Sequence, residues 1–274
     1  MGQKINPILY RLGISKTWNT KFYETKKSEL PLYTFQCLEL KQYIEKFLKD
    51  HGLILHSYNI HYNQSMLNIY ISYFIPIIFK MDNQEEITKT LNKLNKKIEM
   101  LKFAEGVNLF TNKRYKINTI FQCTNKSFHC LNFNDLFFIE RKVKVLGRFR
   151  SEKENFKFNE TFNLMCNSVL NKNSAYMIGN SIADTLKNLK KHNRFLKCIQ
   201  KIFTILIHAK FSKIKSIKIQ VSGKINRSRR TRTKVIKVGD LPIQTINTNL
   251  DYSQTTVTHN PNGSFGIKIW VIYK

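Results

Sequence analysis

The sequence predicts an α+β protein, and the order of its patterned segments is the reason. The first hundred residues read as helix, strand, strand and helix, and the last hundred read as two amphipathic helices followed by four strands. Blocks of helices and strands that are segregated in this way are typical of α+β folds. Residues 105–160 lie between the two blocks and show weak periodicity, which predicts an insertion or irregular extension with local pieces of strand.

The first block begins with a helix and continues with a hairpin. Apolar residues recur at helical spacing through Leu38–Lys49, and the pair His51-Gly52 is suited to the C-terminus of that helix. Two β-rich runs, Leu53–Tyr62 and Met66–Phe79, are separated by three polar residues, which predicts a β-hairpin. The segment Asp82–Met100 returns to the helical period and completes a small α+β unit.

The last hundred residues carry the clearest patterns. Two amphipathic helices are marked by apolar residues on one side, which are Ile178, Ile182, Leu186 and Leu189 in the first and Phe195, Ile199, Ile202, Phe203 and Leu206 in the second. Apolar and polar residues then alternate through Ile217–Ser222 with the period of a half-exposed strand. Three more strands are expected at Arg232–Val238, Ile243–Leu250 and Phe265–Tyr273. The resulting unit is a four-stranded, mainly antiparallel sheet on which two helices pack.

The charge of the chain is strongly one-sided. It has 46 Lys or Arg against 18 Asp or Glu, a formal net charge of +28. The 55 residues between Asp184 and Asp240 contain 17 Lys or Arg and no acid. A solvated helix face normally mixes charges of both signs, so this exclusion of acids predicts a polyanionic partner. The alternative is that chance or codon bias alone produced the pattern.

Other functional classes find little support. The longest apolar run, Met66–Phe79, is too short to span a bilayer, and the basic residues belong to a packed domain, so no membrane partner is expected. A Walker A loop, a dinucleotide-binding glycine motif and the common hydrolase motifs are all missing, so no enzyme and no cofactor is predicted. Cys123, His129, Cys130 and Cys166 lack the paired spacing of a zinc site.

Residue usage indicates an A/T-rich genome. The chain has 36 Lys, 32 Ile, 28 Asn and 20 Phe but only four Ala, and the four abundant types are encoded by A/T-rich codons. No secretory signal or transit sequence is expected at the N-terminus, which suits synthesis inside an organelle. We therefore expect a mitochondrial protein, with a plastid or the cytoplasm of an A/T-rich bacterium as alternatives.

Five separated blocks of sequence carry a further signal. They are Met1–Pro7 with Arg11–Ile14 and Trp18-Asn19; Ile217–Lys224; Arg232-Thr233 with Gly239, Pro242 and Thr245; Asp251-Tyr252; and Gly266–Trp270. In this order the blocks resemble the universal small-subunit ribosomal protein S3 family. The resemblance covers residues 1–100 and 161–274 and leaves the stretch between them unmatched.

The resemblance implies three domains. They are an rRNA-docking segment at 1–36, a type II KH-like domain at 37–173 that an insertion at about 105–160 interrupts, and a basic α+β domain at 174–274. KH domains clamp nucleic acid with a Gly-x-x-Gly loop, but Ile77–Asn83, where the loop belongs, contains no glycine. The clamp is therefore expected to be lost and the KH-like unit kept for packing. Its last strand is expected near Thr161–Ser168.

One face of the second C-terminal helix is the first candidate site. Arg194, Lys197 and Lys201 are spaced i, i+3 and i+7, so they share a face opposite the apolar side, and Lys190 and Lys191 extend the charge backwards. The resemblance implies that this face lines the entrance of the mRNA channel. Clustered cations neutralise phosphates and release counterions without reading the sequence.

Two further sets are expected to bind rRNA. The turn after Gly223 carries Arg227, Arg229, Arg230, Arg232 and Lys234, and arginine binds phosphate bidentately. The N-terminal set, which is carried over from the family, consists of Gln3, Lys4, Asn6 and Arg11.

These expectations describe a structural constituent of the small ribosomal subunit that binds head-domain rRNA and lines the mRNA entrance. Family analogy adds ribosomal proteins S10 and S14 as neighbours, and no homo-oligomer is expected. A free RNA-binding or RNA-annealing factor on the same scaffold is the alternative. A nucleic-acid-cleaving enzyme is a third hypothesis, and it would need paired carboxylates near the basic face.

Overall fold

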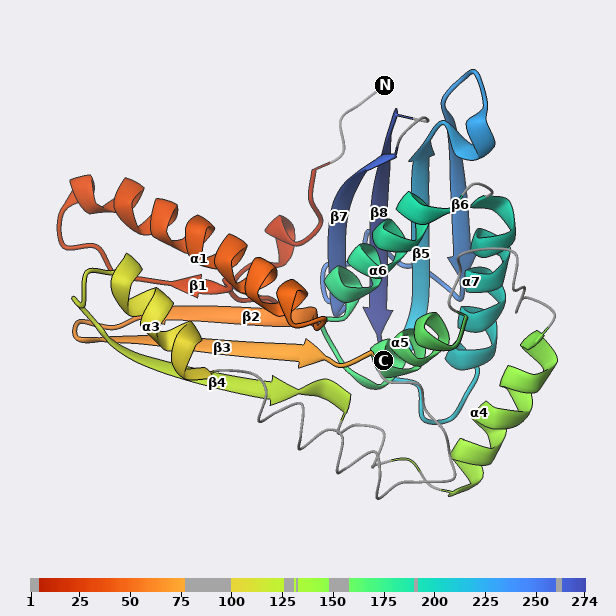
Figure 1. Ribbon diagram of the computed structural model, residues 1–274. Helices are drawn as coiled ribbons and strands as arrows, with labels where there is room; N and C mark the ends of the chain where they lie inside the picture. Colours follow the sequence, from red (N-terminus) through yellow and green to blue (C-terminus); the bar gives the residue numbers. More distant parts are fainter. Residues whose placement is uncertain are drawn as a thin grey trace. The chain divides into compact units, whose positions relative to one another are not determined.

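The computed structural model describes residues 5–76, 100–125, 131, 133–147, 158–189, 192–259 and 263–274. The chain forms two compact units, one made of Trp18–Thr124 and the other of Met1–Thr17 with Asn125–Lys274. Each unit contains a four-stranded sheet and helices, so the predicted α+β class is confirmed (Figure 1). Within the residues given above, no helix is both long and apolar enough to cross a membrane.

The first unit, Trp18–Thr124, is built on a sheet with the strand order β1-β2-β3-β4. Its strands are β1 (Thr20–Lys21), β2 (Ile54–Tyr62), β3 (Met66–Phe74) and β4 (Lys116–Cys123). The two central strands are antiparallel, and each outer strand runs parallel to its neighbour. The predicted hairpin is thus confirmed as β2–β3, and across its turn the Asn63 N–H donates to the Met66 carbonyl at 2.8 Å.

Two helices, α1 (Leu30–Asp50) and α3 (Met100–Phe110), cover one face of this sheet. The buried stripe of α1 recurs every three or four residues, as a helix that packs on one side requires, at Cys37, Leu40, Ile44 and Leu48. The fully buried ring of Phe103 on α3 lies 5.2 Å from the Tyr43 ring on α1 and 5.4 Å from the Phe121 ring on β4. Both helices therefore share one apolar core with the same face of the sheet.

The helix predicted over Leu38–Lys49 is confirmed as the second half of α1. It ends as its pattern indicates, because Gly52 adopts a positive φ of 71° and its N–H donates to the Lys49 carbonyl at 2.9 Å. The predicted helix over Asp82–Met100 and the loop Ile77–Asn83 lie, except for Met100, outside the described residues.

Regular structure of the first unit continues to Cys123, inside the stretch expected to be an insertion or extension. Most of α3 and all of β4 fall after residue 104. The inward residues of β4, such as Ile117 and Phe121, alternate with exposed residues, among which Lys116, Asn118 and Gln122 are polar but Ile120 is apolar. The period of a strand is therefore present in the burial pattern, but the polar Thr119 on the inward side and the apolar Ile120 on the outward side weaken the alternation in the sequence.

The second unit contains an antiparallel sheet with the strand order β6-β5-β8-β7. Its strands are β5 (Ile214–Gly223), β6 (Arg232–Val238), β7 (Leu250–His259) and β8 (Gly263–Tyr273). Its helices are α4 (Phe133–Leu146), α5 (Phe158–Leu170), α6 (Ala175–Asn188) and α7 (His192–Ile207). Two helices pack on this sheet: α6 packs on β7 and β8, and α7 packs on β5 and β6. The third helix, α5, packs against both α6 and α7 (Figure 1).

The two predicted C-terminal helices and three of the four strands are confirmed. Ile178 and Ile182 of α6 and Phe203 of α7 are fully buried, as their helical spacing predicts. Gly179 lets α6 approach β7 closely, because a Cβ at this position would lie 2.9 Å from the Ser253 hydroxyl oxygen.

The strand expected over Ile243–Leu250 is wrong. This segment is mostly loop, and the strand begins only at Leu250. The apolar residues that suggested a strand have another use, since Leu241 and Ile243 pack against Leu250, Trp270 and Ile272.

The strand expected near Thr161–Ser168 is also wrong, because the segment lies inside α5. Nearly every residue of α5 from Thr161 onward is buried. A helix that is buried all round shows no amphipathic period, so its pattern does not distinguish it from a buried strand.

Candidate nucleic-acid interface

The outer side of α7 carries the first group of predicted RNA-binding residues. Arg194, Lys197 and Lys201 are exposed. The inner side is buried and packs on β5 and β6 through residues that include Phe195, Ile199, Ile202 and Phe203. The three cations therefore face away from the sheet, as the spacing predicts.

Cys198 lies on α7 between these cations. Burial raises the pKa of its thiol to about 12, while the charges of Arg194 and Lys201 act in the opposite direction. The thiol therefore stays protonated at neutral pH and behaves as a packing residue. What α7 presents to solvent is positive charge and not a reactive sulfur.

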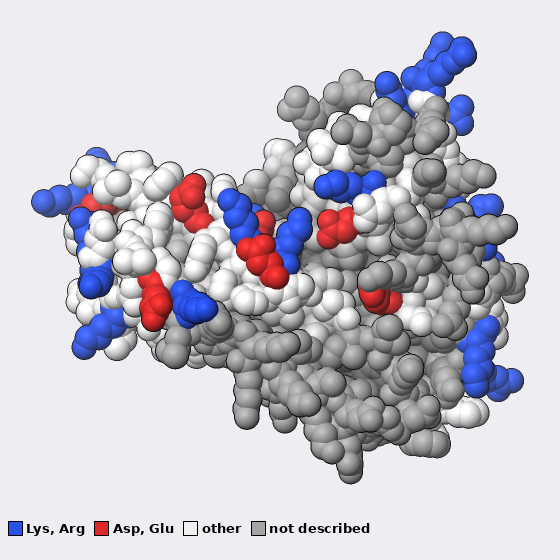
Figure 2. Space-filling view, viewed as in Figure 1, with Lys and Arg blue, Asp and Glu red and all other residues white. Residues whose placement is uncertain are grey.

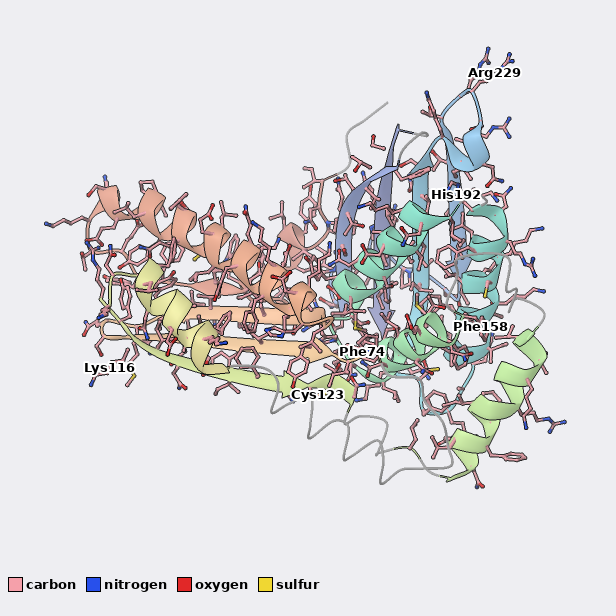
Figure 3. The ribbon with its side chains drawn as sticks, viewed as in Figure 1. Phe74, Lys116, Cys123, Phe158, His192 and Arg229 are labelled. Carbon is pink, nitrogen blue, oxygen red and sulfur yellow. The ribbon has the colours of Figure 1, made fainter. Side chains whose placement is uncertain are left out.

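The tip of the β5–β6 hairpin carries the second group. Arg229, Arg230 and Arg232 are exposed there, and the Ser228 hydroxyl donates to the Arg230 carbonyl at 2.8 Å. Figure 3 shows the Arg229 side chain at the outer end of the hairpin. In Figure 2, Lys and Arg side chains stand at this tip and along the edge where Figure 1 draws α7, and the acids visible in that view lie elsewhere.

A reciprocal pair of hydrogen bonds ties the hairpin to the start of α7. The His192 N–H donates to the Asn226 side-chain oxygen at 2.7 Å, and the Asn226 N–H donates to His192 Nδ1 at 3.1 Å. The buried His192 ring also lies edge-on to Phe265, with ring centroids 5.1 Å apart. Asn226 thus caps a helix N-terminus from another element, and its positive φ of 55° is one that Asn tolerates better than most residues.

We call Arg194, Lys197, Lys201, Arg229, Arg230 and Arg232 the basic face. The His192–Asn226 pair holds its two parts in a fixed relation. Such an array of cations on rigid elements is suited to neutralising several phosphates at once.

Lys234 differs from the other cations that the sequence grouped with the hairpin. It is half-buried, and its Nζ donates to the Asn193 side-chain oxygen on α7. Its ammonium group is therefore engaged in joining β6 to α7, and we leave it out of the basic face.

The prediction made for Arg11 needs correction. Arg11 was expected to contact rRNA, but only 2% of it is exposed. Its guanidinium donates to the backbone carbonyls of Pro7, Ile243, Thr245 and Thr248 at 2.8 to 3.3 Å. The side chain is thus used to fasten the N-terminal segment to the loop before β7, because the planar fork of arginine can serve several carbonyls together.

A second contact fastens the same segment near the start of α6. The Lys16 ammonium donates to the Asn173 side-chain oxygen at 2.9 Å and also lies near Asp251. The half-buried Asp251 carboxylate accepts a hydrogen bond from the Ala175 N–H at 2.9 Å. Burial raises the pKa of Asp251, and the charge of Lys16 offsets part of this shift. The carboxylate thereby satisfies an N–H in the first turn of α6.

The remaining predicted residues are distributed as follows. Asn6 is exposed, and its side-chain oxygen accepts a hydrogen bond from the Ile8 N–H at 3.0 Å. Gln3, Lys4, Lys190, Lys191 and the side chain of Arg227 lie outside the described part of the chain.

The structure adds three lysines that the sequence reasoning did not assign. Lys218, Lys237 and Lys268 lie on the helix-free face of the second sheet, and the Lys218 ammonium lies 4.7 Å from the centre of the Trp270 ring. The sequence does contain a pattern that predicts Lys218 on the outer face of the strand, because Lys218 stands between the buried Ile217 and Ile219.

Comparisons with known proteins agree on one family. The family model described as "Ribosomal protein S3, C-terminal domain" matches residues 186–271. The chain is 25% identical to small ribosomal subunit protein uS3 of Ligilactobacillus salivarius over 272 residues, which cover 99% of this chain and 92% of that protein. It is 24% identical to small ribosomal subunit protein uS3c of Euglena gracilis over 275 residues, which cover 99% of each chain. It is also 25% identical to uS3c of Guillardia theta over 274 residues, which cover 99% of this chain and 94% of that protein.

Proposed function

The chain belongs to the ribosomal protein S3 family, and we propose that it is a structural constituent of the small ribosomal subunit. In finer terms, it binds rRNA of the subunit head through the N-terminal segment and the β5–β6 hairpin. The outer side of α7 then faces incoming mRNA. The protein acts by binding RNA and performs no reaction of its own.

The observation that carries this proposal is the exposure of the basic face on packed elements. The stretch between Asp184 and Asp240 contains 17 Lys or Arg and no acid, and the members of the basic face are exposed. A carboxylate near a phosphate site would repel the ligand, so the exclusion of acids favours RNA over a protein partner with mixed charges. The contacts are expected to position the backbone of RNA without reading its sequence.

The anchoring of the N-terminal segment also supports the proposal. Arg11 and Lys16 hold this segment to the second unit, so its exposed residues are offered from a fixed position. Tyr10, which is 58% exposed, is suited to stacking on unpaired bases. The segment therefore offers RNA both hydrogen-bonding groups and an aromatic ring.

The partners and the compartment follow from the same reasoning. Ribosomal proteins S10 and S14 are the proposed neighbours. The A/T-rich residue usage favours an organellar ribosome, in a mitochondrion first and a plastid second.

Sedimentation of a native extract from cells that contain the protein tests the proposal. We expect the chain to migrate with the small subunit and to stay there after a wash in high salt, because many phosphate contacts and buried contacts act together. A second function, a free RNA-binding or RNA-annealing factor, uses the same basic face. Recovery of most of the chain in slowly sedimenting fractions, with RNA binding retained, would support that factor and overturn the ribosomal assignment.

A further inference from the structure

We infer that the helix-free face of the first sheet is a second RNA-binding surface, which binds single-stranded RNA by stacking and by amide hydrogen bonds. We call it the β1–β4 platform. It belongs to the unit Trp18–Thr124, shares no residue with the basic face, and does not include the loop Ile77–Asn83.

The strand registers define the rows of the platform. Side chains of directly paired residues lie on the same face of a sheet. One row consists of Lys21, His61, Asn68 and Asn118, the next of Asn59, Tyr70 and Ile120, and a third of Ser57, Ser72 and Gln122, while Met66 and Lys116 pair at one end.

Helices α1 and α3 lie on the opposite face. Leu67, Ile69 and Ile71, which alternate with platform residues in β3, are buried beneath them. On the platform itself Met66, Tyr70 and Ile120 remain 45%, 39% and 46% exposed. Large side chains in the middle of this sheet are therefore accessible to a ligand.

The platform has unused hydrogen-bonding capacity. Within the described residues, the side chains of Asn59, Asn68, Asn118 and Gln122 form no hydrogen bond with the rest of the chain. Each amide offers a donor and an acceptor a short distance apart. This combination matches the edges of unpaired bases, which single-stranded RNA displays.

Aromatic rings supply the second requirement. Tyr70 lies in the central row, and its ring packs edge to face with His61, with centroids 5.7 Å apart. Stacking of a base on an exposed ring is tolerant of sequence because every base has a π face.

The charge of the platform selects the ligand. The four strands contain no Asp or Glu, and Lys21 and Lys116 stand at its margins. Figure 3 labels Lys116 at the start of β4. Interfaces with another protein are depleted in lysine at their centre and rely on apolar anchors. Exposed amides that are flanked by lysines, with no acid nearby, instead suit a nucleic acid, which has an anionic backbone and polar bases. The occupant is therefore single-stranded RNA.

Fluorescence anisotropy with a labelled, unstructured RNA oligonucleotide of mixed sequence tests the inference on the full-length protein. The combined change Tyr70→Ala and Asn118→Ala should weaken binding about tenfold, since one stacking contact and one hydrogen-bonding group are lost. Tyr70→Phe should retain most of the affinity because the ring remains. The matched control is Tyr23→Ala, a residue 84% exposed outside the platform, which should leave binding unchanged.

A second measurement separates this inference from the proposed function and from misfolding. Ultraviolet cross-linking of RNA that contains 4-thiouridine should yield a labelled β3 peptide with Tyr70, and the far-UV circular dichroism melt of the double variant should match that of the parent chain. Unchanged affinity together with cross-links confined to the basic face would overturn the inference and leave the ribosomal proposal intact. Weaker but measurable binding after the basic face is neutralised, with the Tyr70 cross-link retained, would support it.

Discussion

Helix α7 in the second unit and helix α1 in the first both cover a four-stranded sheet with one apolar side, yet their outer sides differ. The outer side of α7 carries Arg194, Lys197 and Lys201. On α1, by contrast, Lys41 forms an ion pair with Glu45 at 3.8 Å, which is the mixed pattern of an ordinary solvated helix. The absence of acids, more than the presence of lysine, therefore marks which surface is suited to RNA.

By the same criterion, the absence of acids, the surface suited to RNA is formed by a different kind of element in each unit. In the second unit a helix and a hairpin tip present the acid-free surface, and in the first unit the sheet presents it. One packing scheme can therefore offer RNA either its covering helix or its open strands, depending on where the acids are placed. The following experiments test whether the two units are separate in stability and in function, from the largest expected effect to the smallest.

The largest effect is expected from Phe103→Ala in the core of the first unit. Removal of a fully buried ring that contacts Tyr43 and Phe121 should cost about 4 kcal/mol of unfolding free energy. Hydrogen exchange read by mass spectrometry should accelerate in β2 and β3 and remain unchanged in β5 and β8. Phe35→Ala, at a residue 56% exposed on α1, is the control and should change little. Equal acceleration in both units would show that they unfold together.

Arg11→Ala should destabilise the second unit by about 3 kcal/mol, because the carbonyls around its buried guanidinium lose their donors. Arg11→Lys should restore little of this, since one ammonium cannot replace the fork. Thermal unfolding measures the effect, and Arg141→Ala at an exposed position of α4 is the control, expected within about 0.5 kcal/mol of the parent. Unchanged stability combined with weaker RNA binding would return Arg11 to the role that the sequence suggested.

Neutralising the outer side of α7 should weaken RNA binding without affecting the fold. Replacement of Arg194, Lys197 and Lys201 by Ala should reduce affinity by roughly 10- to 100-fold at low salt and lower the slope of log affinity against log salt by about 2 for single-stranded RNA. Filter binding over a range of salt concentrations measures both quantities. The charge-matched control replaces the exposed Lys210, Lys213 and Lys215, which lie outside the basic face. Similar slopes for the two triple variants would mean that only net charge matters.

Asn226→Ala should have the smallest effect, about 1 kcal/mol, because it removes one helix cap. The hairpin should then move more freely relative to α7, so RNA affinity should fall by a few-fold only. Hydrogen exchange at the first turn of α7 reports the loss of the cap. Asn226→Gly is the companion variant, since it tolerates the positive φ but also lacks the cap, and it should behave like the Ala variant if the cap is what matters.

Local periodicity was sufficient to predict the helices and most strands. Ile178 and Ile182 of α6 and the alternation around Ile219 reflect a buried side that any short window of sequence reveals. The outer cations of α7 could be predicted for the same reason, because the apolar residues identify the buried side of a helix and the residues opposite them must then be exposed. The hairpin β2–β3 was also predictable, because its turn is local.

The errors arose where a residue's partner is distant in sequence. Arg11 looks like a surface cation until it meets the carbonyls of Ile243 and Thr245, which are more than 230 residues away. Those carbonyls serve Arg11 instead of a neighbouring strand, which is why Ile243–Leu250 is not a strand. The buried helix α5 and the strand β4 were missed because their surroundings, and not their own patterns, determine their structure.

The fastening of the first residues to the loop before β7 also affects the order of events during synthesis. The ribosome makes Pro7 and Arg11 more than 230 residues before Thr245 and Thr248, so the segment around Arg11 must remain undocked until the chain has emerged through Thr248. Contacts of such long sequence separation form late in folding. A nascent chain that stops before Thr245 would thus lack the docked segment, and only a chain that extends past Thr248 can present that segment in its final place for assembly.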